Sequence, residues 1–136
     1  MSATTRWEES LSVGVDTIDV DHRRLVAMLD ELYGAVGADD SKAVLARTVS
    51  SLLDYSREHF RDEEAVMRRH AYPEIRKHAA EHQDLLRKLS EIKNKVDGGE
   101  VDLTLEVMDF LGGWLTGHIL GADKRLGIFL QADEAR

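Results

Sequence analysis

The chain has 136 residues, a single proline, no cysteine and a formal net charge of −8. With 43% hydrophobic and 32% charged residues, it can bury the core of one globular domain without disulfides. The lack of cysteine excludes thiolate metal sites, and the negative charge argues against nucleic acid as a partner. No apolar run is long enough for a signal peptide or a membrane span, so we expect a cytoplasmic protein without membrane insertion.

Four segments repeat apolar residues at the spacing of three and four that is typical of amphipathic helices. In chain order they cover residues 19–36, 45–66, 73–96 and 103–118. We expect Asp19 to cap the first helix and Pro73 to stand at the first position of the third. Short connections between long helices favour antiparallel neighbours, so the sequence predicts an all-α, up-down-up-down antiparallel four-helix bundle.

The ends of the chain differ from these four segments. Residues 1–18 predict an irregular N-terminal arm that lies on the bundle. Residues 19–130 predict the bundle and a short C-terminal extension. No linker or internal repeat interrupts the chain, so residues 1–136 are expected to form a single domain.

Five of the six histidines lie on the predicted apolar stripes, with at least one on every helix: His22, His59, His78, His82 and His118. One histidine on an apolar face is usually a satisfied core residue. Five are harder to satisfy, because each buried imidazole without a partner costs about 1–3 kcal/mol and the stripes offer few carbonyls or hydroxyls. A shared metal would satisfy all five together.

The axial positions of these residues agree with a shared site. In an up-down-up-down bundle the starts of the first and third helices lie level with the ends of the second and fourth, so all five histidines fall in one layer. Glu63, four residues after His59, lies on the same stripe, whereas Glu64 is rotated away and is predicted to be a surface residue. His70 lies roughly 16 Å further along the axis and is interpreted as an ordinary residue at the helix end.

Three segments resemble the signature blocks of the hemerythrin family, and of the bacteriohemerythrins in particular: "VDTIDVDHRRL", "HFRDEEAVMRRHAYPEIRKHAAEH" and "WLTGHILGADKRL". The resemblance covers the chain from Trp7 to about Leu130. It implies a hemerythrin-like domain with two non-haem iron ions (Fe²⁺/Fe³⁺), joined by a bridging oxo or hydroxo group, that binds dioxygen reversibly. It also implies the ligands: His78, His82 and His118 on one iron, His22 and His59 on the other, and Glu63 and Asp123 as bridges.

Asp123 does not follow from periodicity alone. It stands five residues after His118, and in a regular helix this spacing turns it away from the stripe. A bridging Asp123 therefore requires a π-turn or an irregular helix end, which the "GAD" sequence at residues 121–123 permits.

Counting the ligands of two six-coordinate irons leaves one position open, on the iron assigned to His22 and His59. We expect dioxygen to bind there, and small anions such as azide to bind there in the diferric form. The predicted oxygen pocket consists of apolar neighbours of these ligands: Leu25, Phe60, Trp114, Leu115 and Ile119.

The ligand set is rich in neutral imidazole and contains no Glu-x-x-His motif, which favours an oxygen carrier, storage or delivery protein with at most weak side activity over an enzyme. Two alternatives stay open. One is an oxygen- or redox-sensing module with a signalling partner, and the other is a di-iron oxidase or nitric-oxide-handling enzyme. A carrier would deliver to an oxygen acceptor that the sequence does not identify. A structural zinc site is disfavoured, because seven ligands are too many for one tetrahedral ion.

Overall fold

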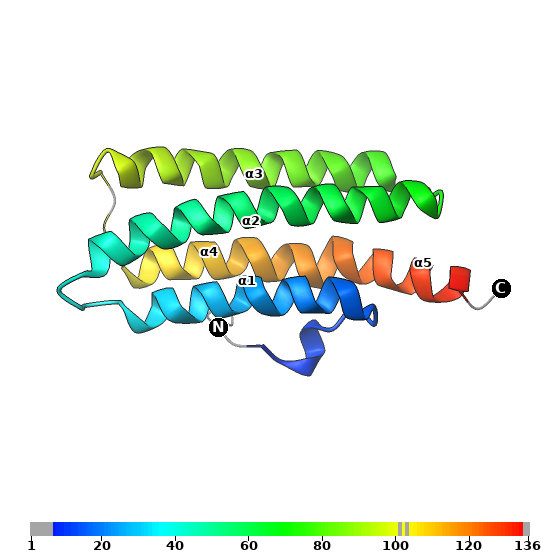
Figure 1. The fold of residues 1–136 in the computed structure, drawn as a ribbon, viewed down its shortest axis with the longest axis horizontal. Helices are drawn as coiled ribbons and strands as arrows, with labels where there is room; N and C mark the ends of the chain where they lie inside the picture. The colour runs from blue at the N-terminus through cyan, green and yellow to red at the C-terminus, as the bar shows by residue number, and fades with distance from the viewer. Residues whose placement is uncertain (1–6, 101, 103, 135–136) are drawn as a thin grey trace.

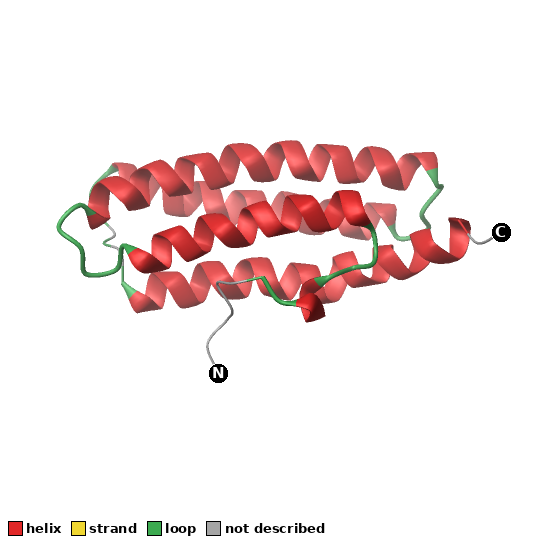
Figure 2. Cartoon of the chain, turned by 60° about the horizontal axis from the view of Figure 1, so that its bottom comes forward, coloured by secondary structure: helices red, strands yellow, loops and turns green. Residues whose placement is uncertain are grey.

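The computed structural model describes residues 7–100, 102 and 104–134, and they form an all-α bundle of four antiparallel columns (Figure 1). No strand occurs in these residues (Figure 2). After a short 3₁₀ turn at Glu9–Leu11, the helices are α1 (Asp16–Gly34), α2 (Ser41–Arg69), α3 (Ile75–Asp97), α4 (Leu105–His118) and α5 (Lys124–Glu134). A π-helix, η2 (Ile119–Asp123), joins α4 to α5, so that the three form one continuous column.

The helices pack in the predicted order. Helix α2 packs against both α1 and α3, and α4 returns to lie against α1. Trp114 on α4 connects the remaining pair, because its indole N–H donates to the carbonyl oxygen of Leu85 on α3 at 3.1 Å. The predicted antiparallel four-helix bundle is confirmed. None of the described helices is long and apolar enough to cross a membrane.

The end of the bundle away from the histidines has an aliphatic core. Its residues come from the end of α1, the start of α2, the end of α3 and the start of α4, and they include Leu29, Leu32, Leu45, Val49, Leu52, Leu89 and Leu111, all fully buried. Burial of a leucine side chain stabilises a fold by roughly 1.5–3 kcal/mol, so this half holds the four columns together.

Two predicted helix starts were wrong by two or three residues. Helix α1 begins at Asp16 with Val15 at the N-cap position. The carboxylate of Asp19 instead accepts hydrogen bonds from the Ser12 hydroxyl at 2.5 Å and the Val13 amide at 2.9 Å, so it fastens the arm to α1. Helix α3 begins at Ile75, and Pro73 lies in the preceding turn.

The described part of the N-terminal arm lies against the bundle, although helix α1 already begins at Asp16, inside the predicted arm of residues 1–18. Its side chains Leu11 and Val13 are buried. A Cβ atom at position 127 would collide with the carbonyl oxygen of Val13, so glycine at this position of α5 allows the arm to lie against the helix. Residues 1–6 of the predicted arm and residues 101 and 103 near the fourth helix lie outside the described residues.

One residue of the fourth predicted segment does not face the core. Phe110 follows the apolar spacing of residues 103–118, which predicts a buried side chain, but 46% of it is exposed. The buried face of α4 instead carries Met108, Leu111 and Leu115. Helix α4 is apolar almost all round near Phe110, so the pattern does not distinguish its buried face from its exposed face.

Candidate metal centre

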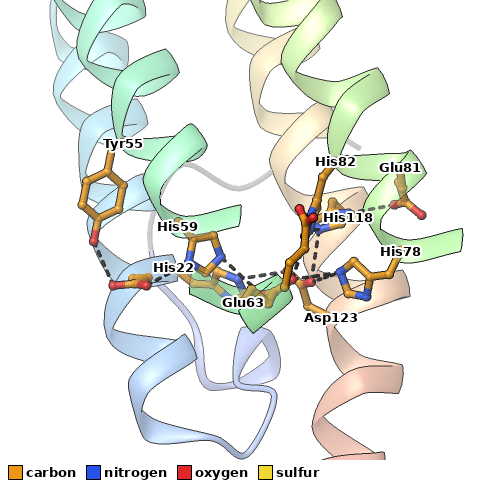
Figure 3. A network of polar contacts seen from close by, with 11 residues as sticks. His22, Tyr55, His59, Glu63, His78, Glu81, His82, His118 and Asp123 are labelled. Carbon is orange, nitrogen blue, oxygen red and sulfur yellow. Dashed lines mark hydrogen bonds and ion pairs between the residues drawn. The ribbon is translucent and has the colours of Figure 1, made fainter. Parts of the chain in front are cut away.

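All seven predicted ligand residues are buried at one level of the bundle, and all four columns contribute (Figure 3). Helix α1 supplies His22, α2 supplies His59 and Glu63, and α3 supplies His78 and His82. His118 is the last residue of α4, and Asp123 is the last residue of η2. His70 lies elsewhere, at the C-cap of α2, where its Nδ1 is 2.6 Å from Asp133 Oδ2.

The donor atoms form two groups that share both carboxylates. One group consists of Glu63, His78, His82, His118 and Asp123, and the other of His22, His59, Glu63 and Asp123. Within each group the candidate ligand atoms lie within 4.8 Å of one another. Two neighbouring centres with two shared carboxylates therefore fit this arrangement better than a single centre does.

Each shared carboxylate directs one oxygen to each group. Glu63 Oε1 lies 2.9 Å from His78 Nε2, while its Oε2 lies 3.3 Å from His59 Nε2 on the other side. Asp123 repeats this division, with Oδ1 2.9 Å from His78 Nε2 and Oδ2 2.9 Å from His22 Nε2. Both carboxylates thus have the orientation that bridging two cations requires.

The protein alone does not satisfy these atoms. His82 Nε2 and His118 Nε2 face each other at 3.2 Å. The contacts His22 Nε2–Asp123 Oδ2 and His59 Nε2–Glu63 Oε2 lack hydrogen-bond geometry, so these four buried atoms are left without a hydrogen bond. Each such atom costs about 1–3 kcal/mol, and a cation between the groups would remove that cost. Imidazole nitrogens and carboxylate oxygens are donors that iron accepts, so the residues fit the metal that the sequence suggested.

The π-helix brings Asp123 to the site. A π-helix takes more residues to complete a turn than an α-helix does. Asp123, five residues after His118, therefore returns to the core side of the column, where it is fully buried. The π-turn that the spacing of His118 and Asp123 requires is thus present.

The charges of the site are strongly coupled. Burial lowers the pKa of His59, but the close contact with the Glu63 carboxylate and its charge outweigh burial and raise that pKa to about 9. His78 is affected in the same way, with Asp123 and Glu63 raising its pKa to about 9. Burial and the charge of Asp123 raise the pKa of Glu63, yet the contacts with three imidazoles dominate and lower it to about 2. Burial raises the pKa of Asp123 as well, but its contacts with His118, His22 and His78 hold it well below the usual value. Both carboxylates are therefore anionic across the ordinary pH range, and their charge favours either protonated imidazoles or a bound metal.

Three further carboxylates orient the imidazoles from outside. The Nδ1 atoms of His59, His82 and His118 lie 2.8, 2.9 and 2.8 Å from oxygens of Asp21, Glu64 and Glu81, respectively. These contacts fix the Nδ1–H tautomer, which leaves each Nε2 lone pair directed into the site. Asp21 and Glu81 were not predicted from the sequence.

Glu64 requires a correction. It was predicted to be a surface residue, but its side chain is only 20% exposed and contacts His82 on the neighbouring helix. The spacing within α2 indicates which way Glu64 points, but it does not indicate which residue of α3 lies opposite. All three carboxylates could have been found from their positions in the sequence. Each stands next to a predicted ligand: Asp21, Glu64 and Glu81.

A small, largely apolar cavity adjoins the site. On the side of the donors it is bordered by His22, His59, His118 and Asp123. Leu85 and four of the five predicted pocket residues complete the lining: Leu25, Phe60, Trp114 and Leu115. Its volume of about 10 Å³ is close to the minimum that holds one water-sized molecule. Ile119, the fifth predicted residue, is fully buried but does not border this cavity.

Comparison with known proteins agrees with this site. The hemerythrin HHE cation binding domain matches residues 13–127. The chain is 31% identical over 118 residues to a bacteriohemerythrin of Stenotrophomonas maltophilia, covering 87% of this chain and 76% of that protein. It is 32% identical over 117 residues to myohemerythrin-1 of Phascolopsis gouldii, covering 86% and 87% of the two chains.

Solved structures agree as well. A wild-type hemerythrin crystal structure superposes with a TM-score of 0.82 at 26% identity, covering 91% of this chain and 95% of the other. A variant of a hemerythrin with one leucine replaced by alanine gives 0.84 at 25% identity, with coverages of 94% and 98%. The fold and site thus define a non-haem iron, oxygen-binding helical bundle. The chain belongs to the hemerythrin family, and within it resembles the bacteriohemerythrins.

Proposed function

We propose that this protein binds dioxygen reversibly at two irons, as a carrier, storage or delivery protein. His78, His82 and His118 hold one iron, His22 and His59 hold the other, and Glu63 and Asp123 bridge them. The observation that carries the proposal is the division of the two buried carboxylates, each with one oxygen toward each group of imidazoles. When bound, the irons supply two electrons and an open coordination position for a small ligand.

The unequal groups favour an open position on the iron held by His22 and His59. Three imidazoles serve one centre and two serve the other. The small cavity borders both imidazoles of the smaller set, but only His118 of the larger set. Its apolar lining keeps bulk water away, which favours release of a bound ligand unchanged over further reaction.

The first test is metal content. Purified protein from iron-replete cells should contain about two irons per chain, as the two donor groups require, and show oxo-bridged diferric absorption in the near ultraviolet. Reduced protein should change colour reversibly on cycles of air and vacuum. His70→Ala is the matched control, because His70 lies outside both groups and its loss should leave the iron content unchanged. A single zinc per chain would contradict the proposal.

A second test addresses the open position. Azide should bind the diferric protein once per site, and a crystal structure should place it on the iron held by His22 and His59. Azide on the iron held by three histidines, or two azides per site, would overturn this assignment.

A third test addresses the cavity wall. Leu115→Ala enlarges the cavity and admits water, so the oxygenated protein should autoxidise faster while its iron content stays the same. Leu111→Ala is a control in the same helix, since Leu111 is buried outside this cavity. Equal autoxidation rates for Leu115→Ala and the parent would remove Leu115 from the mechanism.

A further inference from the structure

The ligands of the metal centre are enclosed by the folded chain. None of the seven side chains is exposed by more than 4%. The cavity that adjoins the site on the inside has a volume of about 10 Å³, which is too small for a metal ion with its bound waters. An ion that reaches the metal-free protein therefore needs another way between the helices.

A groove between the start of α1 and the end of α2 reaches the ligands from outside. Its volume is about 550 Å³. Six waters at about 30 Å³ each occupy roughly 200 Å³, so a hydrated cation has room in it. The lining includes two of the ligands, and we call it the acidic groove: Val20 and Asp21 from α1 and His59, Asp62, Glu63 and Arg69 from α2.

Three carboxylates line the acidic groove from the surface inward. Asp62 is exposed, the side chain of Asp21 is 30% exposed, and Glu63 is only 2% exposed. The guanidinium of Arg69 is the opposing charge in the lining, so the carboxylates outnumber it. A cleft in which one sign of charge prevails raises the local concentration of ions of the opposite sign. This groove therefore concentrates cations beside the metal centre.

Two other grooves on the surface lack this combination. One, of about 410 Å³ between α3 and α4, has two lysines and two glutamates in its lining. The other, of about 350 Å³, lies further along α1 and α2 and has two arginines and one glutamate. Neither is lined by a ligand of the metal centre. An excess of carboxylates and contact with the ligands thus occur together in the acidic groove.

The inner end of the acidic groove has donor atoms without partners. Glu63 Oε2 and His59 Nε2 are buried and make no hydrogen bond, and both residues line the groove. Both side chains extend from α2 into the metal centre (Figure 3). These two atoms indicate a bound cation independently of the charges nearer the surface, because a cation would satisfy both of them.

We propose that the acidic groove is the route by which Fe²⁺ enters the folded, metal-free protein. Asp62 attracts the hydrated ion at the mouth, and Glu63 and His59 replace its waters at the inner end. Asp21 contributes charge along the way, because its oxygens are already held by Tyr55 Oη at 3.0 Å and His59 Nδ1 at 2.8 Å. The route rests on the two-iron centre of the proposed function, but it determines the rate of loading and not the final metal content.

Charge changes in the groove test the route. Rapid mixing of metal-free protein with Co²⁺, whose visible absorption changes when imidazoles bind it, measures the rate of uptake. Asp62→Asn should slow uptake about threefold at low ionic strength, and Arg69→Gln should accelerate it by a similar factor. Both effects should shrink in high salt, which screens exposed charges. Glu31→Gln is the control, because it removes the same charge from the groove further along α1 and α2.

Narrowing the groove gives an independent test. Val20 lines the acidic groove and is 58% exposed, so Val20→Trp can place its indole over the groove without disturbing the core. Uptake of Co²⁺, and of Fe²⁺ in the absence of oxygen, should become about tenfold slower, while circular dichroism and the final metal content remain those of the parent. Ala27→Trp is the control, because it adds the same side chain at an exposed position of α1 in the other groove.

The rate and the final metal content separate the two proposals. Slower uptake by Asp62→Asn and Val20→Trp, with full metal content at the end, would support the route. Uptake by either variant as fast as by the parent would overturn it and would mean that the ion enters where the bundle opens elsewhere. Parent protein that takes up no metal at all would overturn the proposed function, and the route with it.

Discussion

The two halves of this bundle are built from the same four columns but differ in what fills them. At one end, the aliphatic core is closed by leucines and needs no ligand. At the other end, five imidazoles and two carboxylates occupy the same axial layer, and several of their atoms have no partner in the protein. The aliphatic half therefore stabilises the fold, and the histidine half uses some of that stability to hold unsatisfied donors in place.

The largest expected effect comes from the aliphatic half. Leu45→Ala removes a fully buried side chain and should lower the free energy of unfolding by about 2–5 kcal/mol. The loss should be similar in the iron-loaded and metal-free proteins, because Leu45 touches neither donor group. Chemical denaturation measures the free energy of unfolding of the iron-loaded and of the metal-free protein. Tyr33→Ala, at a half-exposed position, is the control and should cost much less. If Leu45→Ala lowered the free energy of unfolding of the iron-loaded protein but not of the metal-free protein, the two halves would not be independent.

Iron removal should affect only the histidine half. A ligand present at 100 times its dissociation constant stabilises the folded state by about 2.7 kcal/mol, so chelation should lower stability by at least this order. Hydrogen exchange should then accelerate in the turns around His22, His59 and His118, while the turns around Leu45 and Leu111 keep their protection. Uniform loss of protection along all four columns would mean that the halves do not separate in this way.

The outer carboxylates should have a smaller effect. Glu81→Gln keeps a hydrogen-bond acceptor near His118 Nδ1 but removes the negative charge. Changes of this kind typically reduce metal affinity about 10- to 100-fold, and competition with a chelator would measure the loss. Glu91→Gln, on the exposed face of the same helix, is the matched control. Equal affinities for Glu81→Gln and the parent would show that the charge of Glu81 beside His118 does not strengthen metal binding.

The pH dependence of the metal-free protein should be the smallest of these effects, because the shifts of the histidines and of Glu63 arise from the same shared contacts and do not add. The pKa values of His59 and His78 are raised from 6.5 to about 9, so their stabilising contribution is complete below pH 6.5 and is lost as the pH rises through 9. The pKa of Glu63 is lowered from 4.5 to about 2, so its contribution is lost as the pH falls below 4.5.

Metal-free protein should therefore be most stable between about pH 4.5 and 6.5, and its denaturation midpoint should decline toward pH 9. Bound iron takes the place of the protons on the imidazoles, so the iron-loaded protein should keep its midpoint over the same range. A metal-free midpoint that rises from pH 6.5 to 9 would contradict the coupling between the histidines and the shared carboxylates.

The histidine layer could be predicted from the sequence for two reasons. Helical periodicity indicates which residues share a face, and the alternating direction of the helices indicates where each residue lies along the bundle axis. It predicted the face of Phe110 wrongly, since an almost wholly apolar helix has no contrast for periodicity to detect. The contacts of Asp21, Glu64 and Glu81 were missed because each one crosses between helices. Such contacts depend on how two helices are rotated against each other, and spacing within one helix does not determine that rotation.

The contact between Val13 and Gly127 joins two segments that lie far apart in the chain. More than a hundred residues lie between them, so closing this loop carries an entropic cost that the packing of the bundle must offset. Gly127 stands one helical turn after Asp123, in the same continuous column. Asp123 is also the last of the seven site residues to leave the ribosome, after the histidines of α1, α2 and α3. Both donor groups include Asp123, so neither is complete until the column of α4, η2 and α5 has packed.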